Sequence, residues 1–515
     1  MNKIIVLLLT FFLLVTNQIH SQNIFVDLKG NDNNPGTIDQ PLSLITTAIE
    51  KIQPGDTIFV RAGVHSYSST ISVSSSKNGS EVKRYYLFGY KSERPVLDFS
   101  SMEANSSNRG INFKASFWHV KGFDFKGAGD NGMNLSGSNN IVEYCSFYEN
   151  KDTGLQLSGG ASNNQIINCD SYYNADLSNQ NADGFAPKLD VGNNNYFYGC
   201  RAWQNSDDGW DGYLRTSPTS STILENCWCF SNGYLKDGKA SSGNGNGYKM
   251  GGGDNGNSAN TAHSFTLKNC LVFDNRVKGF DQNNNKGSMT ILNCTAYRNG
   301  TNYSIPLLLN ENEILTISNC ISLGNYGTIG SFAQQQTNSW VAPFIVAEED
   351  FISIDTTEVR GKRKSDGSLP DIHFMHLAQG SDLIDAGTDV GLPFLGFKPD
   401  IGAFEFDNIS STAEQIEKIP ETFVLEQNYP NPFNPSTIIN FTVANGTNLA
   451  LPKKVTLKVY DILGNEITTL VDEYKQPGKY SVKLSASDFQ FSSGVYFYRL
   501  NSGSFSQTNK MVLIK

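Results

Sequence analysis

The residues with the clearest chemical potential are carboxylates placed around a recurring glycine. Asp183 and Asp208 each come one residue before a Gly that is followed by a large apolar residue, and Asp207 lies beside Asp208. Asp211 and Lys249 each come two residues after such a Gly. If these glycines occupy equivalent places in successive repeats, four carboxylates and one amine gather at one edge of the molecule.

Such a group of carboxylates repels itself unless a cation neutralises it. Hard oxygen ligands, with no His or Cys clustered among them, are typical of Ca²⁺ rather than of a transition metal. The alternative is a solvated acidic turn, which describes most Asp-rich loops. That alternative is the better one for Asp207 and Asp208 alone, but the shared register of Asp183 and Asp211 favours a Ca²⁺ site.

Lys249 has two interpretations. It can form a salt bridge within its own column, between Asp211 and Asp281, which also come two residues after a Gly. Alternatively, it can act as a base beside the metal, in a Gly-rich stretch (243–253) that leaves room for a substrate. Spacing alone does not separate the two. A nearby Ca²⁺ disfavours the ammonium form and the carboxylates favour it, so the direction of the pKa shift of Lys249 stays open.

Further residues near the proposed site have less specific patterns. Lys188, Arg215 and Arg276 lie on turns and are candidates to bind substrate carboxylates, with ordinary surface charges as the alternative. Trp210 and Tyr248 directly follow the recurring Gly, so we expect them to pack in the core rather than to stack on a sugar ring.

The elements that must position these residues follow from an internal repeat. Seven of the eight cysteines are followed five residues later by Asn, and the intervals between those cysteines are 24, 31, 27, 43, 24 and 26 residues. A unit of about 24 residues with short strands and turns is typical of a parallel β-helix, in which each coil stacks about 4.8 Å above the previous one. The pairs are Cys145/Asn150, Cys169/Asn174, Cys200/Asn205, Cys227/Asn232, Cys270/Asn275, Cys294/Asn299 and Cys320/Asn325.

Equivalent residues of such a fold form columns along its axis. We expect the Cys column to face the core as free thiols and the Asn column to bridge coils by side-chain hydrogen bonds. Disulfides between adjacent coils are the alternative, because eight is an even number and the chain has features of a secreted protein. Thiols are favoured, since the repeat builds a long core of its own and places its cysteines at one structural phase.

Composition excludes several classes of protein. The 515 residues include 17% charged residues and carry a formal charge of −10, which excludes a coiled coil, a collagen, a multi-span membrane protein and a basic nucleic-acid-binding protein. At the N-terminus, Lys3 precedes an apolar run from Ile4 to Val15, and polar residues lead to Ser21. This pattern predicts a signal peptide over residues 1–21 and a secreted protein.

With these residues in register, the chain resembles a known family. The segments Asn181–Phe185, Ser206–Asp211 and Gly247–Lys249 resemble those of the right-handed β-helix pectate lyases of polysaccharide lyase family 9. The similarity extends from about Ile24 to Phe406 and includes a short helix near residues 41–52. It implies a right-handed parallel β-helix domain over residues 22–406.

The resemblance also implies roles for the five residues of the cluster. Asp183, Asp207, Asp208 and Asp211 match the calcium ligands of the family, and Lys249 matches its Brønsted base. The implied reaction is β-elimination on polygalacturonate: Ca²⁺ binds the C6 carboxylate of a galacturonyl unit, neutral Lys249 removes the C5 proton, and the C4–O4 bond breaks. Because only the neutral amine accepts a proton, activity is expected to rise with pH.

Two other functions stay open from the sequence. One is a rhamnogalacturonan lyase of the same family, whose polysaccharide substrate has a backbone that alternates galacturonate with rhamnose. A non-catalytic β-helix adhesin, stabilised by calcium, belongs to a different class. Lys249 separates the adhesin from the lyases, since an adhesin needs no base beside its metal.

A different pattern begins after Phe406. Residues 407–421 are polar and predict a linker, and residues 422–515 alternate apolar and polar side chains, as in a small Ig-like antiparallel β-sandwich. Tyr429–Pro435, Val459–Gly464 and Gly494–Tyr498 resemble the type A C-terminal sorting domain of the type IX secretion system.

The resemblance of this tail implies the type IX secretion machinery as a partner. The protein is then secreted or attached to the outer-membrane surface. A carbohydrate-binding sandwich is the alternative for the same strands. We expect an all-β monomer whose other partner is an acidic polysaccharide, with no nucleic acid.

Overall fold

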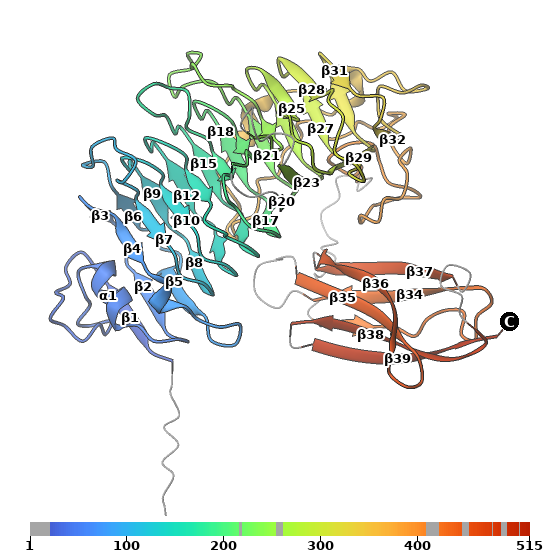
Figure 1. Ribbon diagram of the computed structural model, residues 1–515, viewed down its shortest axis with the longest axis horizontal. Helices are drawn as coiled ribbons and strands as arrows, with labels where there is room; N and C mark the ends of the chain where they lie inside the picture. Colours follow the sequence, from blue (N-terminus) through green and yellow to red (C-terminus); the bar gives the residue numbers. More distant parts are fainter. Residues whose placement is uncertain are drawn as a thin grey trace, which may run out of the picture.

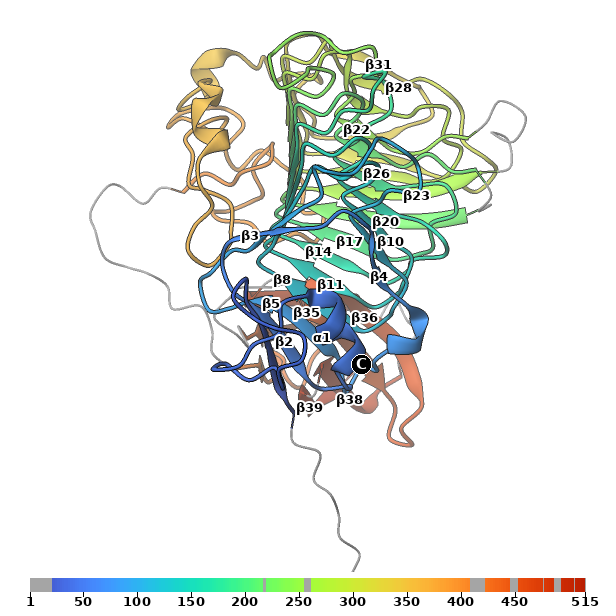
Figure 2. The ribbon, with the colours of Figure 1, turned by 90° about the vertical axis from the view of Figure 1, so that its left-hand side faces the viewer.

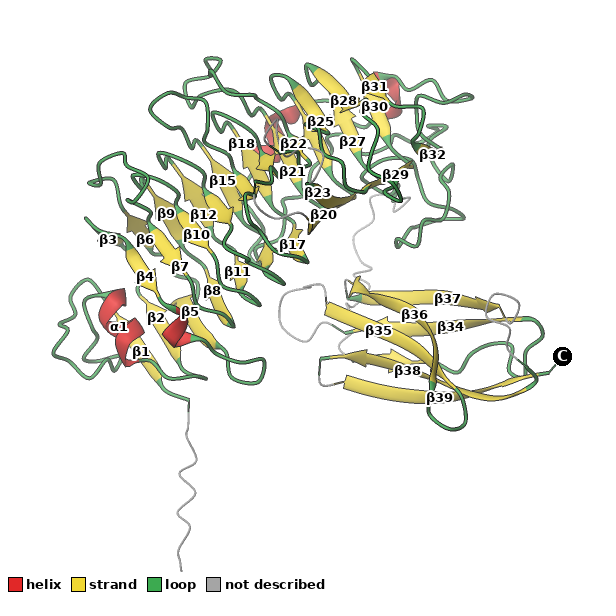
Figure 3. Cartoon of the chain, in the orientation of Figure 1, coloured by secondary structure: helices red, strands yellow, loops and turns green. Residues whose placement is uncertain are grey.

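The computed structural model describes residues 21–215, 219–253, 261–407, 422–444, 453–475, 477–485, 492–503 and 505–514. Its larger part is a parallel β-helix, as the repeat predicts, and the helix is right-handed, as the family resemblance implies (Figures 1 and 3). The signal peptide expected over 1–21 and the linker expected over 407–421 lie almost entirely outside the described residues. No helix among the described residues is long and apolar enough to cross a membrane.

Three parallel sheets form the walls of the β-helix (Figure 2). In spatial order, the first sheet contains β1 (Asn23–Val26), β2 (Thr57–Val60), β5 (Tyr85–Gly89), β8 (Trp118–Lys121), β11 (Ile141–Glu143), β14 (Gln165–Ile167), β17 (Asn195–Tyr198), β20 (Thr219–Glu225), β23 (Ala262–Lys268), β26 (Met289–Leu292), β29 (Leu315–Ser318) and β32 (Gln334–Gln336). The second contains β4 (Ile71–Val73), β7 (Ile111–Phe113), β10 (Met133–Leu135), β13 (Leu155–Leu157), β16 (Phe185–Pro187), β19 (Trp210–Asp211), β22 (Tyr248–Lys249), β25 (Lys278–Asp281), β28 (Thr301–Ile305) and β31 (Gly327–Ile329). The third contains β3 (Val64–Ser66), β6 (Val96–Asp98), β9 (Asp124–Lys126), β12 (Ser146–Tyr148), β15 (Asp170–Tyr172), β18 (Arg201–Trp203), β21 (Trp228–Phe230), β24 (Leu271–Phe273), β27 (Thr295–Tyr297) and β30 (Ile321–Leu323).

Coils stack in register, so equivalent side chains meet in the interior. In the second sheet Phe185 pairs with Trp210, Trp210 with Tyr248, and Tyr248 with Phe280. Successive rings have centroids 4.8, 5.2 and 5.5 Å apart. Trp210 and Tyr248 are fully buried, which confirms their predicted place in the core. Each such side chain contributes roughly 1.5–3 kcal/mol by leaving water, and together they hold neighbouring coils at a constant spacing.

The cysteine column lies in the same core. All eight cysteines are buried free thiols, which confirms thiols over disulfides. Burial raises the pKa of the Cys145 thiol well above its usual value, and contact with Cys169 raises it further. The thiols therefore pack as small apolar groups.

An asparagine ladder joins the coils at the turn that follows the third sheet. Each member donates from Nδ2 to Oδ1 of the next at 2.8–2.9 Å, through Asn150, Asn174, Asn205, Asn232, Asn275 and Asn299. The seventh predicted member, Asn325, is not in the ladder. Asn302 accepts from Asn299 instead, at 3.0 Å, because β28 begins directly after the turn and brings Asn302 beside it. Asn325 is exposed and donates to the carbonyl of Gly300.

The two ends and one side of the stack are covered. Helix α1 (Ile45–Lys51) contacts β1, β2 and β4 at the N-terminal end, close to the helix predicted near 41–52. The coils end at β32, and residues 337–407 run back over the outer face of the third sheet (yellow to orange in Figure 2). The similarity to family 9 predicted one domain to residue 406; the structure divides that range into a stack of coils and this closing segment. Short 3₁₀ turns occur at Ser75–Lys77, Glu348–Asp350 and Thr356–Arg360.

The closing segment is needed because the outer face of the third sheet is apolar. Its strands present a row of large side chains, which would otherwise form an exposed hydrophobic patch. Phe374 and Leu377 of the closing segment pack in one cluster with this row. The row consists of Trp203, Trp228, Phe230, Leu271, Phe273 and Tyr297.

The C-terminal part is an antiparallel β-sandwich, as predicted. One sheet contains β33 (Val424–Leu425), β34 (Ser436–Val443) and β37 (Gly478–Ser485), and the other contains β36 (Glu466–Lys475), β35 (Lys453–Tyr460), β38 (Gly494–Ser502) and β39 (Phe505–Leu513). Alternate apolar residues of the two sheets, among them Ile439, Leu457 and Leu500, form a core of their own. This core is separate from that of the β-helix, so the sandwich is a second structural unit.

Candidate active site

One column of polar residues, at the turn that leads into the second sheet, contains the predicted site. We call it the turn column; it consists of the residue before the recurring Gly in successive coils, namely Arg109, Asn131, Thr153, Asp183, Asp208, Asn246 and Lys278. The Gly is required by close stacking, because a Cβ at Gly184 would lie 2.7 Å from the carbonyl oxygen of Gly209. Polar side chains therefore follow one another along the axis at about 4.8 Å.

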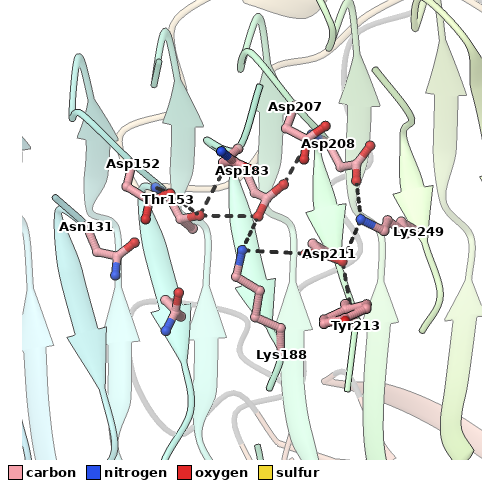
Figure 4. Close-up of polar contacts among 12 residues, drawn as sticks. Asn131, Asp152, Thr153, Asp183, Lys188, Asp207, Asp208, Asp211, Tyr213 and Lys249 are labelled. Carbon is pink, nitrogen blue, oxygen red and sulfur yellow. Dashed lines mark hydrogen bonds and ion pairs between the residues drawn. The ribbon is translucent and has the colours of Figure 1, made fainter. Parts of the chain in front are cut away.

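Three of the predicted carboxylates converge in and beside this column. One oxygen each of Asp183, Asp207 and Asp208 lie within 4.8 Å of one another, and all three side chains are buried (Figure 4). Asp211 follows on β19, with its side chain only 6% exposed. The structure thus brings together all four aspartates that the glycine register predicted, although 24 residues separate the first two along the chain.

Two ammonium groups lie among these carboxylates. Lys188 Nζ is 2.7 Å from Asp183 Oδ2 and 3.5 Å from Asp211 Oδ2. Lys249 Nζ is 3.0 Å from Asp208 Oδ2 and 3.3 Å from Asp211 Oδ1. Lys188 directly follows β16, whereas Lys249 lies on β22, and Asp211 contacts both lysines (Figure 4).

Lys249 occupies the column position that its spacing predicted. It pairs in register with Asp211 on one side and with Asp281 on the other. Asp281 forms its ion pair with Lys278, at 2.9 Å. Lys249 is therefore free to turn toward Asp208 and Asp211, so that its amine lies in the aspartate cluster.

Burial, together with repulsion from neighbouring carboxylates, makes Asp183 and Asp207 harder to ionise than a free aspartate. Burial, together with Asp208 and Asp183, raises the pKa of Asp207 to about 9, against a smaller opposing effect of Lys249. Burial also raises the pKa of Asp183, to about 7, although Lys188 acts in the opposite direction. The two lysines thus leave part of the cluster's charge uncompensated.

The aspartates of the cluster also shift the pKa of Lys249. Burial alone would lower the pKa of Lys249, but Asp208 and Asp211 outweigh it and hold the pKa well above the usual value. The carboxylates thus favour the ammonium form of Lys249, one of the two directions that the sequence left open. Burial likewise opposes ionisation of Asp211, yet Lys249 and Lys188 lower its pKa.

The cluster opens into a cleft of about 480 Å³. Lys188, Lys249 and Arg215 line it, and Asp152 and Gln156 extend it along the preceding coils. Two of the three cations proposed for substrate binding therefore face the cleft. Because its lining residues come from several successive coils, the cleft can accommodate a polymer that lies across them.

Arg276 is placed differently from Lys188 and Arg215. Its guanidinium donates to the carbonyl of Gly243, and its side chain packs against Gly233 and Gly245. It is not among the residues that line the cleft. Arg276 thus supports the Gly-rich loop that forms one wall of the cleft.

A further group of polar residues, not singled out from the sequence, lies on the N-terminal side of the cluster. Asp130 and Asp152 each come two residues before the recurring Gly, the position that Asp207 occupies in its coil. Asn131, in the turn column, is 2% exposed. The signal that could have revealed this group is Gly132 followed by Met133, which repeats the glycine-plus-apolar pattern one coil earlier than Gly154.

Comparison with families of known proteins matches both parts of the chain. Residues 24–312 match the family described as the Pel9A-like, right-handed beta helix region. Residues 427–515 match the secretion system C-terminal sorting domain. The first match covers the cluster and its cleft, and the second covers the sandwich.

Individual relatives resemble the β-helix over most of their length. Pectate lyase L of Dickeya chrysanthemi is 36% identical over 386 residues, which is 73% of this chain and 88% of that protein. Pectate lyase L of Paenibacillus polymyxa (strain SC2) is 38% identical over 392 residues, 72% of this chain and 84% of that protein. The crystal structure of pectate lyase Pel9A has 35% identity and a TM-score of 0.69, covering 76% of this chain and 98% of its own. A rhamnogalacturonan lyase has 26% identity and a TM-score of 0.61, covering 70% and 97%.

Proposed function

Since the chain belongs to polysaccharide lyase family 9, we propose that it is a calcium-dependent pectate lyase that cleaves polygalacturonate by β-elimination. The observation that carries the proposal is the pair of contacts from Lys249 to Asp208 and Asp211, at 3.0 and 3.3 Å. They put a base and a set of oxygen ligands in one cleft. A polysaccharide lyase needs both, because it must remove a carbon-bound proton beside a carboxylate.

The aspartate cluster fits a calcium ion. Its donors are carboxylate oxygens only, which is the ligand type that Ca²⁺ prefers. When all are ionised, four carboxylates and two ammonium groups leave two negative charges, which one divalent cation balances. Burial is the main cause that raises the pKa of Asp183 and Asp207, and a cation among the carboxylates would act in the opposite direction. We assign Asp183, Asp207, Asp208 and Asp211 as the ligands. A bound ion supplies positive charge that engages the uronate carboxylate, acidifies the neighbouring C5 proton and favours the neutral form of Lys249.

Lys249 is the proposed base. Its Nζ takes the C5 proton, the electrons of the C5–H bond form the C4=C5 double bond, and the C4–O4 bond breaks with its electrons on O4. The leaving oxygen then takes up a proton and becomes the new reducing end of one fragment. The other fragment has a 4,5-unsaturated non-reducing end. Because the carboxylates raise the pKa of Lys249, we expect activity to rise with pH.

Lys188 and Arg215 are proposed to bind substrate carboxylates. Both line the cleft on the side of Asp183 and Asp211. A bound cation takes over the neutralisation of Asp183 and so releases Lys188 to pair with an incoming uronate. Arg276 stays a weaker candidate, because its contacts are with the backbone of the loop around Gly243.

Pectate is favoured over rhamnogalacturonan as the substrate. The relatives named pectate lyase L are 36% and 38% identical to the chain, whereas the rhamnogalacturonan lyase structure is 26% identical. A non-catalytic adhesin is disfavoured, because Lys249 is buried among the acidic residues at a cost that a purely structural metal site does not require.

The C-terminal sandwich directs export. Its match to the sorting domain over residues 427–515 assigns it to the type IX secretion system rather than to sugar binding. The protein is therefore exported, either as a secreted protein or attached to the outer-membrane surface. This agrees with a polymeric substrate, which is too large to enter a cell.

The test uses the purified full-length protein with polygalacturonate and, separately, with rhamnogalacturonan. Formation of the unsaturated product is followed by its ultraviolet absorbance, with added Ca²⁺ or with a chelator. We expect product from polygalacturonate only when Ca²⁺ is present. Product from rhamnogalacturonan alone would show that the protein is a rhamnogalacturonan lyase. Product from neither polysaccharide would refute the lyase assignment.

A further inference from the structure

A second group of oxygen donors lies on the N-terminal side of the aspartate cluster. Met133 pairs in register with Leu155, so Asp130 and Asp152, three residues before each, occupy equivalent places in adjacent coils. Stacked coils are about 4.8 Å apart. Two carboxylates are therefore held beside each other by the backbone, at the edge of the same cleft, which Asp152 lines.

Asn131 adds a buried oxygen that has no partner. Its side chain is 2% exposed, and its Nδ2 donates to Asp130 Oδ2 at 3.3 Å. Its Oδ1 is buried and has no hydrogen-bond partner in the part of the chain that the structure describes. Figure 4 shows this oxygen on the side of Asn131 that faces Asp152. An unpaired buried amide oxygen destabilises the fold, so a cation at this point supplies a missing partner and also relieves the repulsion between the carboxylates.

The group repeats the construction of the first cluster. Asp130 and Asn131 precede Gly132 as Asp207 and Asp208 precede their own glycine. In the first cluster an aspartate of the preceding coil, Asp183, completes the set of oxygens. In the second group an aspartate of the following coil, Asp152, completes the set of oxygens.

The neighbouring basic side chains do not fully neutralise the negative charge of Asp130 and Asp152. Arg109 Nε is 3.2 Å from Asp130 Oδ2, but the arginine side chain is 33% exposed. No ion pair of Asp152 is found among the described residues, and Lys188, which it affects electrostatically, has its Nζ bonded to Asp183. Burial and then Asp152 raise the pKa of Asp130 to about 6, which agrees with an uncompensated charge.

We propose that Asp130, Asn131 and Asp152 form a second divalent-cation site, whose cation holds another carboxylate of the acidic polysaccharide three to four coils away from Lys249. The part that concerns the polysaccharide rests on the proposed function; the cation site does not. Without a cation, Asp130 and Asp152 repel a polyuronate that lies along the cleft. With a bound cation, the same residues attract the polyuronate. Calcium binds here more weakly than at the first cluster, because there are two carboxylates fewer and Arg109 already neutralises part of the charge.

The test measures calcium binding to the full-length protein by titration calorimetry, with Ca²⁺ as the only ligand and no substrate. We expect two ions per chain, one ion for Asp130→Asn and for Asp152→Asn, and one ion for Asp183→Asn. Both isosteric changes in the second site remove repulsion, so these variants fold. Asp371→Asn, at an exposed residue of the closing segment, is the control and should bind as the wild type does.

A reciprocal variant makes the test sharper. Asn131→Asp converts the pair into a copy of Asp207 and Asp208, so we expect calcium at the second site to bind at least threefold more tightly. With substrate, Asp152→Asn should raise the KM for polygalacturonate more than it lowers kcat. A single ion in the wild type that Asp183→Asn abolishes would overturn the second site and leave the proposed function intact. Two ions that persist in Asp183→Asn would instead refute the first ligand set. The number of ions bound by Asp130→Asn then tests the second site independently: one ion supports it and two refute it.

Discussion

Asp211 and Lys249 lie side by side on neighbouring strands, with Lys249 Nζ 3.3 Å from Asp211 Oδ1. The other oxygen of Asp211 faces Lys188 at 3.5 Å. One proposed metal ligand therefore also holds the proposed base and a proposed substrate-binding cation. Metal binding, proton affinity and substrate binding are coupled through this aspartate, because a change in its partners alters the charge that each lysine experiences.

Replacement of the base should remove activity and leave the fold intact. We expect Lys249→Ala to lower kcat by about 10²- to 10⁴-fold, the usual contribution of a positioned base. The measurement is product absorbance with saturating calcium. Lys286→Ala, which removes an exposed lysine bonded only to a backbone carbonyl, is the matched control and should keep wild-type activity. Full activity of Lys249→Ala would assign the proton transfer to another residue.

Removal of calcium should destabilise the β-helix. Calcium binds the folded chain and relieves repulsion in the cluster, so a hundredfold excess over its dissociation constant adds about 2.7 kcal/mol. The unfolding temperature, followed by circular dichroism with calcium or with a chelator, measures this. In Asp183→Asn the increment should shrink, because the cluster has lost a ligand. An unfolding temperature that does not respond to calcium in the wild type contradicts the site.

Lys188 should compete with calcium. Its ammonium occupies the cluster, 2.7 Å from Asp183, so Lys188→Met should tighten calcium binding by about threefold, equivalent to about 0.7 kcal/mol. The same change should raise the KM for polygalacturonate more than it lowers kcat. Calorimetry and steady-state kinetics provide the two readouts. Weaker calcium binding in Lys188→Met would show that the lysine supports the ligands rather than competing with the ion.

The asparagine ladder should contribute strongly to stability. Asn205 accepts from Asn174 at 2.8 Å and donates to Asn232 at 2.9 Å. Asn205→Ala leaves buried partners unsatisfied, so we expect a loss of at least about 1–3 kcal/mol, seen as a lower unfolding temperature. Asn325→Ala is a close control, because Asn325 also follows a cysteine by five residues but lies outside the ladder. A similar loss for both would mean that the ladder contributes nothing of its own.

Acid should release the closing segment. Burial opposes ionisation of Asp170, but Arg363 and Arg201, each 2.8 Å away, hold its pKa well below the usual value. A depressed carboxyl pKa stabilises the fold fully above the unfolded value of about 3.9, and the contribution is lost as pH falls below it. Limited proteolysis at decreasing pH should therefore cut the segment after residue 336 first.

Arg363→Met tests the same contact at neutral pH. It leaves Asp170 with one arginine fewer, which costs about 3–5 kcal/mol when a buried pair is broken. We expect the segment to become protease-sensitive at pH 7. Lys362→Met, at the exposed neighbouring residue, should resist protease as the wild type does. Equal resistance of both variants would show that the apolar contacts alone hold the segment.

Much of the fold and of the candidate site follows from the sequence, because both are repetitive. The glycine before each strand of the second sheet brings Asp183, Asp208 and Lys249 into register without any tertiary information. Cys145 and its equivalents likewise predict the core, since one residue type recurs at one phase. Ion pairs were less predictable: the contact of Lys188 with Asp183 depends on side-chain directions that spacing does not specify.

The parts that could not be predicted are those where the repeat changes or ends. Asn302 replaces Asn325 in the ladder because the turn before β28 is short, which a fixed interval from Cys does not reveal. The closing segment has no period, so its return across the third sheet leaves no pattern in the sequence. Arg276 lies under a Gly-rich loop, and its role there depends on how that loop folds.

The closing segment also has a consequence for how the protein leaves the cell. It precedes the sorting domain along the chain, and the ribosome synthesises it first. Every polypeptide that carries the export tag therefore already possesses the cover for the aromatic row of the third sheet. A chain that ends before residue 337 lacks both, so its aromatic row is uncovered and it carries no export tag. The presence of the sorting domain thus implies that the closing segment has also been synthesised.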